Sequence, residues 1–289
     1  MQHAQAYLLA DGKRLHLQHG PIDLIVEAFG AGREAAYHRA ANRFETVLEE
    51  LVGELSLLRR RVSRQTPPKG QVARRMHAAV LPLGAQFVTP MAAVAGAVAD
   101  EVLCCLCDGV SLRKAYVNNG GDVAFHLERG ETIEAAIAAA AGGRISITSG
   151  MPHRGVATSG WRGRSHSLGI ADSVTAVARN AATADAAATL IANAVDLPGS
   201  ARIRRTPARQ LAPDSDLVDR PVTVAVERLS SAEVEAALAA GSGKASELLD
   251  RGLIGGAVLE LQGVVSLAGP VSTLAGAAAP ASKPESIHA

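Results

Sequence analysis

The sequence predicts an α+β protein in which mixed or antiparallel sheets pack against helices. Stretches with the apolar alternation of strands interleave with stretches that have helical periodicity. Several strands are separated by turns too short for the crossover that joins parallel strands. The 289 residues are 48% hydrophobic and 20% charged, which suits one sizeable globular core.

The N-terminal segment is expected to form a three-stranded meander. Gln5–Leu9 leads to the turn Asp11-Gly12, and Arg14–Gln18 alternates polar and apolar residues as a half-buried strand does. After Gly20-Pro21, the third strand, Ile22–Phe29, is more hydrophobic.

Helices are predicted next. Apolar residues three and four positions apart predict an amphipathic helix over residues 36–51, which continues after a break near Gly53 to Val62. Thr66–Gly70 has the composition of a linker, and Val72–Ala79 is the next predicted helix. A further helix, Pro90–Leu106, is predicted to begin at Thr89 as its N-cap. Its many small residues would let a ligand, another backbone or a second copy of the chain approach closely, so a homo-oligomer stays open.

Three cysteines, Cys104, Cys105 and Cys107, follow one another near the end of that helix. Adjacent cysteines rarely meet disulfide geometry, and no other cysteine exists in the chain. A metal site would need outside ligands, of which His126 is the nearest candidate in sequence. The favoured interpretation is small apolar residues on a buried helix, with reduced thiols that indicate a cytoplasmic protein.

The remaining elements follow the same patterns. Strands are predicted at Lys114–Val117, Val123–Leu127, Arg144–Thr148, Ser173–Ala178, Val222–Val226 and Ala257–Val265. Helices are predicted at Thr132–Ala141, Ala182–Val195, Ala232–Ala240 and Ala245–Arg251. Gly241–Ala245 is interpreted as a turn between the last two helices, because Leu238 stands where a phosphate loop requires its first Gly. One domain, 1–268, with a small C-terminal extension of helix and strand, and a disordered tail, 269–289, are expected.

The charge pattern argues against several partners. The net charge is +1, from 29 basic and 28 acidic residues, and only 3% of the residues are aromatic. Nucleic acids and membrane surfaces normally require a concentrated positive field, so neither is expected as a partner. No stretch approaches the roughly 20 apolar residues of a membrane span, and the N-terminus lacks the pattern of a signal peptide. A small-molecule ligand is expected instead.

Three segments could carry chemistry. Asn118-Asn-Gly-Gly-Asp122 is either a hairpin turn or a bared backbone whose N–H groups contact a phosphate. Thr158-Ser-Gly160 opens a polar loop that reaches His166, which suits anion contacts and proton transfer, although a solvated loop is the simpler interpretation. Asp185 and Thr189 lie at i and i+4 on one helix face, where they could hold Mg²⁺ or only pair locally.

Taken in order, these segments resemble the ApbE superfamily, whose best-known members are FAD:protein FMN transferases. Four ordered segments carry the resemblance: Val117-Asn-Asn-Gly-Gly-Asp122, Ala157-Thr-Ser-Gly160 with His166, Ser173-Val-Thr-Ala-Val-Ala178, and Ala184-Asp-Ala-Ala-Ala-Thr189. Further segments are similar to a short, uncharacterised branch found in bacteria and methanogenic archaea: Gly20–Asp23, Arg75-Met76, Thr89–Gly96 and Asp214–Asp219.

The resemblance implies an ApbE-like fold whose site binds FAD or a related nucleotide with Mg²⁺, and a protein as a further substrate. It implies that Asp185 and Thr189 bind the metal with a main-chain carbonyl near Val94, and that His166 acts as the catalytic group beside the pyrophosphate. It also implies a set of residues that line the dinucleotide: Asn118, Asn119, Gly120, Gly121, Asp122, Thr158, Ser159 and Gly160.

The sequence departs from the transferases at two places. Ala95-Gly96 stands where they carry Lys-Gly, although Asp100 keeps the later acidic position, and Ser167–Asp172 is a compressed form of their D-P-x-T-G segment. Three functions therefore stay open. The first is transfer or hydrolysis at a phosphate anhydride, and the second is non-catalytic binding of a flavin or pterin-like ligand. The third is a biosynthetic role in one-carbon carrier metabolism of the tetrahydromethanopterin type.

Overall fold

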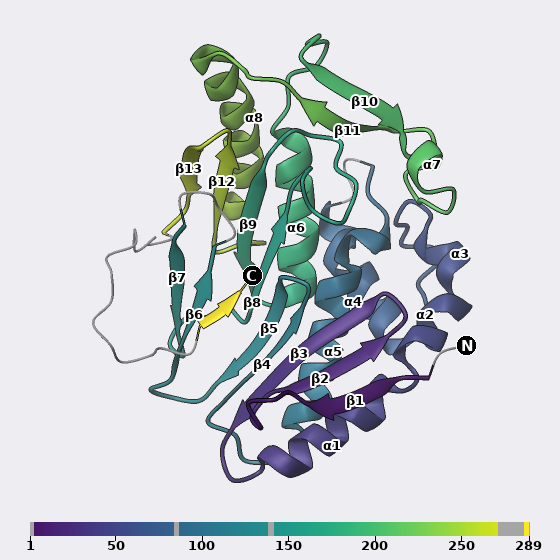
Figure 1. Cartoon of the computed structure of the whole chain (residues 1–289), viewed down its shortest axis with the longest axis vertical. Coiled ribbons are helices and arrows are strands. Elements are labelled where there is room, and N and C mark those ends of the chain that lie inside the picture. The colour runs from purple at the N-terminus through teal and green to yellow at the C-terminus, as the bar shows by residue number, and fades with distance from the viewer. Residues whose placement is uncertain (1–2, 84–86, 138–141, 271–285, 289) are drawn as a thin grey trace.

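A nine-stranded antiparallel sheet forms the centre of the protein (Figure 1), whose computed structural model describes residues 3–83, 87–137, 142–270 and 286–288. Every neighbouring pair in this sheet is antiparallel. In spatial order the strands are β1 (Gln5–Leu8), β2 (Leu15–His19), β3 (Ile22–Phe29), β4 (Lys114–Asn119), β5 (Asp122–Leu127), β8 (Gly155–Ser159), β9 (Ser173–Ala178), β12 (Gly256–Leu261) and β13 (Val264–Ala268). The predicted fold class is confirmed.

One face of the sheet is covered by helices. The helices are α1 (Arg33–Phe44), α2 (Val47–Gly53), α3 (Leu55–Leu58), α4 (Gln71–Val80), α5 (Val94–Cys107), α6 (Ala181–Ala194), α7 (Ala208–Leu211) and α8 (Ser231–Asp250), with 3₁₀ turns η1 (Leu81–Leu83) and η2 (Pro90–Ala93). α5 and α6 pack on the central strands, α1 on β3 and α8 on β12. Alanines dominate the buried surface of α6, so α5 and the sheet approach it closely.

The opposite face is covered by a second sheet, made of β6 (Thr132–Ala136), β7 (Arg144–Thr148) and β14 (Ser286–His288). β6 pairs antiparallel with β7 and parallel with β14. Its inward side chains share a smaller core with the large residues of β4 and β5, including Tyr116 and Phe125. Side chains along β5 therefore alternate between this core and the helical face.

The helix predicted at Thr132–Ala141 is wrong for its first half, because residues 132–136 form a strand; residues 138–141 lie outside the described residues. Ile133, Ala135 and Ile137 are all buried, so a period of two decides the conformation over the helix propensity of alanine. Of the predicted disordered tail, 286–288 pair with β6, whereas 271–285 and 289 lie outside the described residues.

The C-terminal elements also differ from the prediction. α8 is one helix of 20 residues instead of two, and Gly241 lies inside it. Glycine is favoured at this position because a Cβ there would come within 2.3 Å of the Val195 side chain. The single predicted strand 257–265 is the hairpin of β12 and β13, which turns at Gln262 and Gly263 with positive φ. The predicted core strand near Val222 is β11 (Pro221–Val226), which pairs with β10 (Ile203–Pro207) in a separate two-stranded sheet.

The small-residue helix begins with η2 and continues as α5. Thr89 makes no N-cap hydrogen bond; instead its hydroxyl donates to Asp216 Oδ2 at 2.5 Å. Within the described chain, Pro90–Cys107 is one stretch long and apolar enough to cross a membrane, but half of it is buried, and core helices meet the same criterion. The prediction that the cysteines face the core is wrong for Cys104, which is exposed, and only Cys107 of the two half-buried cysteines packs against the main core.

Asp100, in the second turn of α5, joins this helix to the first turn of α6. Its two carboxylate oxygens accept the N–H groups of Ala181 and Ala182, at 3.0 and 2.9 Å, which are free donors at a helix start. We expect Asp100→Ala to lower the free energy of unfolding by about 1–2 kcal/mol, as measured by urea denaturation. Asp100→Asn keeps one acceptor and should lose less. An Asp100→Ala protein as stable as the wild type would contradict this capping role.

The two halves of the large sheet meet at a narrow seam. β5 and β8 are in register over only two residue pairs, Val123 with Val156 and Ala124 with Gly155. The adjacent pairings are longer, with six residue pairs between β4 and β5 and five between β8 and β9. A Cβ at Gly155 would lie 2.1 Å from the carbonyl carbon of Asn180, so glycine is required where α6 crosses this seam.

Candidate functional site

A cavity of about 280 Å³ lies where this seam reaches the β4–β5 turn and the end of β8, beside α5 and α6. Asp122 and Ala124 point to the helical face of β5, and Ala157 and Ser159 do so on β8, because alternate residues share a face. Asp185 and Thr189 meet them from α6. The lining residues are Ala95, Gly120, Gly121, Asp122, Thr158, Ser159, Gly160, Gly163, Arg164, Ser165, Asp185 and Thr189.

Two carboxyl groups, of Asp122 and Asp185, dominate the electrostatics of this cavity. Asp122 Oδ1 accepts the N–H of Thr158 at 3.2 Å, and Asp185 Oδ2 accepts the N–H of Gly96 at 3.1 Å. Burial raises the pKa of Asp122 to about 7. Burial, and then the negative charge of Asp122, raise the pKa of Asp185 well above its ordinary value. A cation between the two carboxylates would relieve both effects.

Hydroxyl groups complete an oxygen-rich wall. The Thr189 hydroxyl donates to Ser159 Oγ at 3.5 Å, which joins α6 to the end of β8. The Thr158 hydroxyl instead points to the opposite face of the sheet, where it lies 2.8 Å from that of Thr175 on β9. Carboxylate and hydroxyl oxygens are the donors that hard divalent cations prefer, so the residues present fit Mg²⁺ in chemical type. The described residues contain no cluster of three or more His, Cys, Asp or Glu side chains suited to a metal.

Main-chain oxygens are also close to this wall. Ala95 lines the cavity, and its carbonyl accepts the Asn119 side-chain N–H at 3.0 Å. Val94, which the resemblance implied, is not among the described lining residues. The role of a main-chain carbonyl near Val94 stays a prediction, and Ala95 is the described residue of this segment that lines the cavity.

The β4–β5 turn has the conformation that its glycines allow. Gly120 and Gly121 have φ of 64° and 114°, and the Gly121 N–H donates to Asn118 Oδ1 at 2.8 Å. A Cβ at Gly120 would lie 1.6 Å from Arg164 Nη2, so the guanidinium group lies directly against this turn. The positive charge of Arg164 also acts on Asp122. The interpretation as a hairpin turn is confirmed, and the turn lines the cavity; contact of its N–H groups with a phosphate stays a prediction.

His166 lies outside the two described cavities of the candidate site. It is exposed on the loop after Gly160, and the described residues that line the cavities include its neighbours Arg164 and Ser165 but not His166. Its catalytic role stays a prediction. Eight of the other predicted residues line one cavity: Gly120, Gly121, Asp122, Thr158, Ser159, Gly160, Asp185 and Thr189. Asn118, Asn119 and Val94 are not among its described lining residues, and their roles stay predictions.

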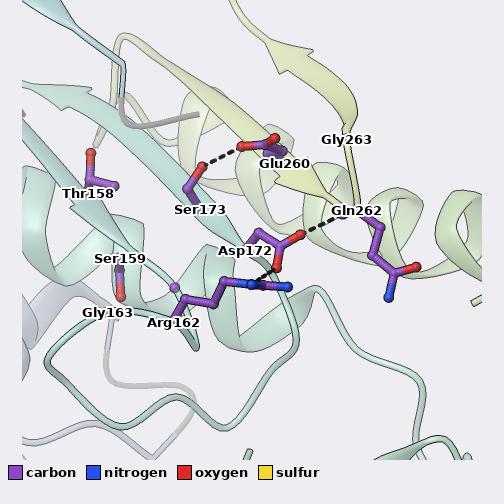
Figure 2. A pocket seen from close by; sticks show the side chains of 10 residues that line it. Thr158, Ser159, Arg162, Gly163, Asp172, Ser173, Glu260, Gln262 and Gly263 are labelled. Carbon is purple, nitrogen blue, oxygen red and sulfur yellow. Dashed lines mark hydrogen bonds and ion pairs between the residues drawn. The ribbon is translucent and has the colours of Figure 1, made fainter. Parts of the chain in front are cut away.

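A second cavity, of about 520 Å³, adjoins the first and shares Thr158, Ser159, Gly160 and Gly163 with it. Figure 2 shows its centre, where Asp172 accepts hydrogen bonds from Arg162 Nε at 2.7 Å and from the Gln262 backbone N–H at 2.6 Å. Asp172 thereby ties the polar loop to the β12–β13 turn. On the far wall, the Ser173 hydroxyl donates to the buried Glu260 at 3.2 Å.

The sequence reasoning missed Glu260 and Gln262 as lining residues. Glu260 stands inside an otherwise apolar stretch, Ala257–Leu261, where a buried carboxylate is unusual, and this was the only signal available. Gln262-Gly263 lies inside the single strand predicted at Ala257–Val265, so the β12–β13 turn that borders the cavity was not predicted.

Comparison with known proteins identifies the family to which this arrangement belongs. A model of the family described as AbpE bacteria matches residues 6–267. The chain belongs to this family. The predicted membership of the ApbE-like superfamily is thereby confirmed.

Relatives of this AbpE-family chain are archaeal UPF0280 proteins. That of Methanothermobacter thermautotrophicus is 43% identical over 38% of this chain and 44% of its own length. That of Methanopyrus kandleri is 39% identical over 43% and 48%, and that of Archaeoglobus fulgidus is 31% identical over 56% and 67%. The aligned part thus spans about half the length of the first two. The apo flavinyl transferase ApbE of Pseudomonas stutzeri is similar over 93% of this chain and 96% of that chain, at 12% identity and a TM-score of 0.48.

Proposed function

We propose that this protein binds a flavin or a related nucleotide together with Mg²⁺, and that it transfers or hydrolyses at a phosphate anhydride. The observation that carries the proposal is a pair of desolvated carboxyl groups, those of the buried Asp122 and the partly buried Asp185, which line one cavity with Thr189 and Ser159. Membership of the AbpE family supports the flavin class of ligand.

In this proposal Asp185 and Thr189 hold the cation, and Asp122 adds a second carboxylate. A bound cation would neutralise phosphate charge as the anhydride breaks. The turn Asn118–Asp122 and the segment Thr158–Gly160 would contact the dinucleotide, whose larger ring could occupy the second cavity. His166 would handle a proton from the polar loop. A protein acceptor and a cytoplasmic location belong to the same proposal.

The direct test is incubation of the purified protein with FAD and Mg²⁺. We expect AMP to be released, and the release to require Mg²⁺ and to be lost in Asp185→Ala. Chromatographic detection of AMP against a no-metal control measures this. Wild-type protein that binds FAD but releases no AMP would refute hydrolysis, and the absence of AMP when an acceptor protein is also present would refute transfer.

A second candidate function is binding without turnover. It is favoured by the composition of the two cavities, whose described lining residues include no Lys or His side chain. It is also favoured by Ala95, which stands where the transferases carry a lysine. A protein that purifies with a flavin or pterin-like ligand, or that such a ligand stabilises against heat without product, would support this candidate.

A further inference from the structure

The last turn of α5 carries a group of thiols that the candidate site does not use. Cys104, Cys105 and Cys107 lie at the end of α5 opposite to Ala95 and Gly96, which contact the cleft. They line a separate cavity of about 690 Å³ between α4 and α5. Its other lining residues are Gln71, Arg74, Arg75, Glu101 and Asp108. All three cysteines of the chain are therefore gathered at one place.

Helix geometry selects one pair among the three. Cys104 and Cys107 form a C-x-x-C spacing, so their side chains leave the helix on the same face, about 60° apart, and their Cα atoms are about 5 Å apart. This separation lies within the range of roughly 4.4–6.8 Å that a disulfide spans. Cys105 leaves the helix about 100° from Cys104 and about 200° from Cys107, which does not favour a bond to either.

The end of the helix also gives the pair room to close. α5 ends at Cys107, and Asp108 after it is extended, with φ −67° and ψ 122°. Helix ends fray, so Cys107 can adjust its conformation without disturbing a helical turn after it.

The two thiols differ in environment. Cys104 is exposed and lines the same cavity as Arg75, whose guanidinium Nε donates to Glu101 Oε2 at 2.8 Å. Cys107 is partly buried, and burial raises the pKa of its thiol to about 11. A nucleophilic thiol is an exposed one near positive charge, so Cys104 is the attacking group and Cys107 the resolving group.

We propose that Cys104 and Cys107 form a reversible dithiol–disulfide pair that is oxidised by hydroperoxides. The Cys104 thiolate attacks the peroxide oxygen, the O–O bond breaks, and a sulfenic acid and one water (or alcohol) form. The Cys107 thiol then attacks the Cys104 sulfur, an S–S bond forms, and a second water leaves. The two thiols lose two electrons and the peroxide gains them. A small dithiol reverses the reaction by thiol–disulfide exchange at the exposed Cys104 sulfur.

The test treats the full-length protein with hydrogen peroxide, alkylates the free thiols and measures the intact mass and the linked peptides. We expect the wild type to lose two thiols and two hydrogen atoms, and dithiothreitol to restore both thiols. Cys105→Ser is the matched control and should form the same bond, whereas Cys104→Ser and Cys107→Ser should not. Arg75→Gln should slow thiol loss by about threefold, and Arg74→Gln should not.

Three outcomes would overturn the proposal. The first is a wild-type protein that keeps all three thiols after peroxide. The second is a bond that needs Cys105 in place of Cys104 or Cys107. The third is oxidation that yields only dimers linked through Cys104 or irreversible sulfinic acid, because neither product requires the pair.

Discussion

Replacing Asp185 by Asn is expected to raise the free energy of unfolding of the cation-free protein at pH 8 by about 1–3 kcal/mol. Asp185 is desolvated and faces the charge of Asp122, so an ionised carboxylate at this position destabilises the folded state. The same variant should lower Mg²⁺-dependent AMP release by about a hundredfold or more, because it removes a charged ligand of the cation. Stability and activity should therefore change in opposite directions.

The stability of the wild-type protein should also depend on pH in a defined direction. Burial raises the pKa of Asp122 to about 7 and that of Asp100 to about 6, from an ordinary value of 3.8. A raised carboxyl pKa contributes stability that is complete below about pH 4 and is lost as the pH rises through the folded-state value. We expect these groups to lower the free energy of unfolding between about pH 4 and pH 8, and Mg²⁺ to restore it at pH 8.

Urea denaturation at several pH values, with and without Mg²⁺, measures both effects. Asp108→Asn is the control, because that carboxylate is 77% exposed beside Arg39. This substitution should change neither the dependence of the free energy of unfolding on pH nor its response to Mg²⁺. An Asp185→Asn protein that is less stable than the wild type at pH 8, and responds equally to Mg²⁺, would show that the two carboxylates do not repel each other.

The second large effect is expected for Gly96→Ala, which should lower the free energy of unfolding by about 3 kcal/mol or more. A Cβ at Gly96 would lie 2.2 Å from the Ala181 carbonyl oxygen and 2.4 Å from its carbon. Both are backbone atoms at the start of α6, so the first turns of α5 and α6 would have to separate. Because the Gly96 N–H also donates to Asp185, the separation would reach the cavity.

The matched control is Gly243→Ala. Gly243 lies inside α8, is exposed, and has no heavy atom within 4 Å of an added Cβ. The substitution should raise the free energy of unfolding by about 0.5–1 kcal/mol, because alanine loses less backbone entropy in a helix. Equal effects of the two substitutions in urea denaturation would contradict the close contact between α5 and α6.

The parts of the fold that were predicted correctly are those decided by local patterns. The strands of the N-terminal meander and the pair around Asn118–Asp122 alternate or turn in ways that need no tertiary information. β6 was missed because Glu-Ala-Ala is a good helical sequence, and only its burial against Tyr116 and Phe125 makes it a strand. α8 was divided at Gly241 because the contact that favours glycine there, with Val195, is distant in sequence.

The candidate site shows the same division. The sequence shows the polar residues that form the site. It gave no physical reason to place them together, and they were grouped only because their segments follow the same order as in the ApbE superfamily. That Asp122 and Asp185 share one cavity follows from the pairing of β5 with β8 and the crossing of α6, which are separated by tens of residues. Glu260 and Gln262 joined the second cavity only because β12 inserts next to β9.

The short pairing between β5 and β8 has a consequence for local opening of the large sheet. Asp122 belongs to one half of the sheet, whereas Thr158 and Ser159 belong to the other, and only two residue pairs hold the halves in register between them. Amide hydrogens at Val123 and Val156 should exchange with solvent sooner than those of β9. A ligand that contacts both β5 and β8 would hold the two halves of the sheet together, and would slow the exchange of these amide hydrogens.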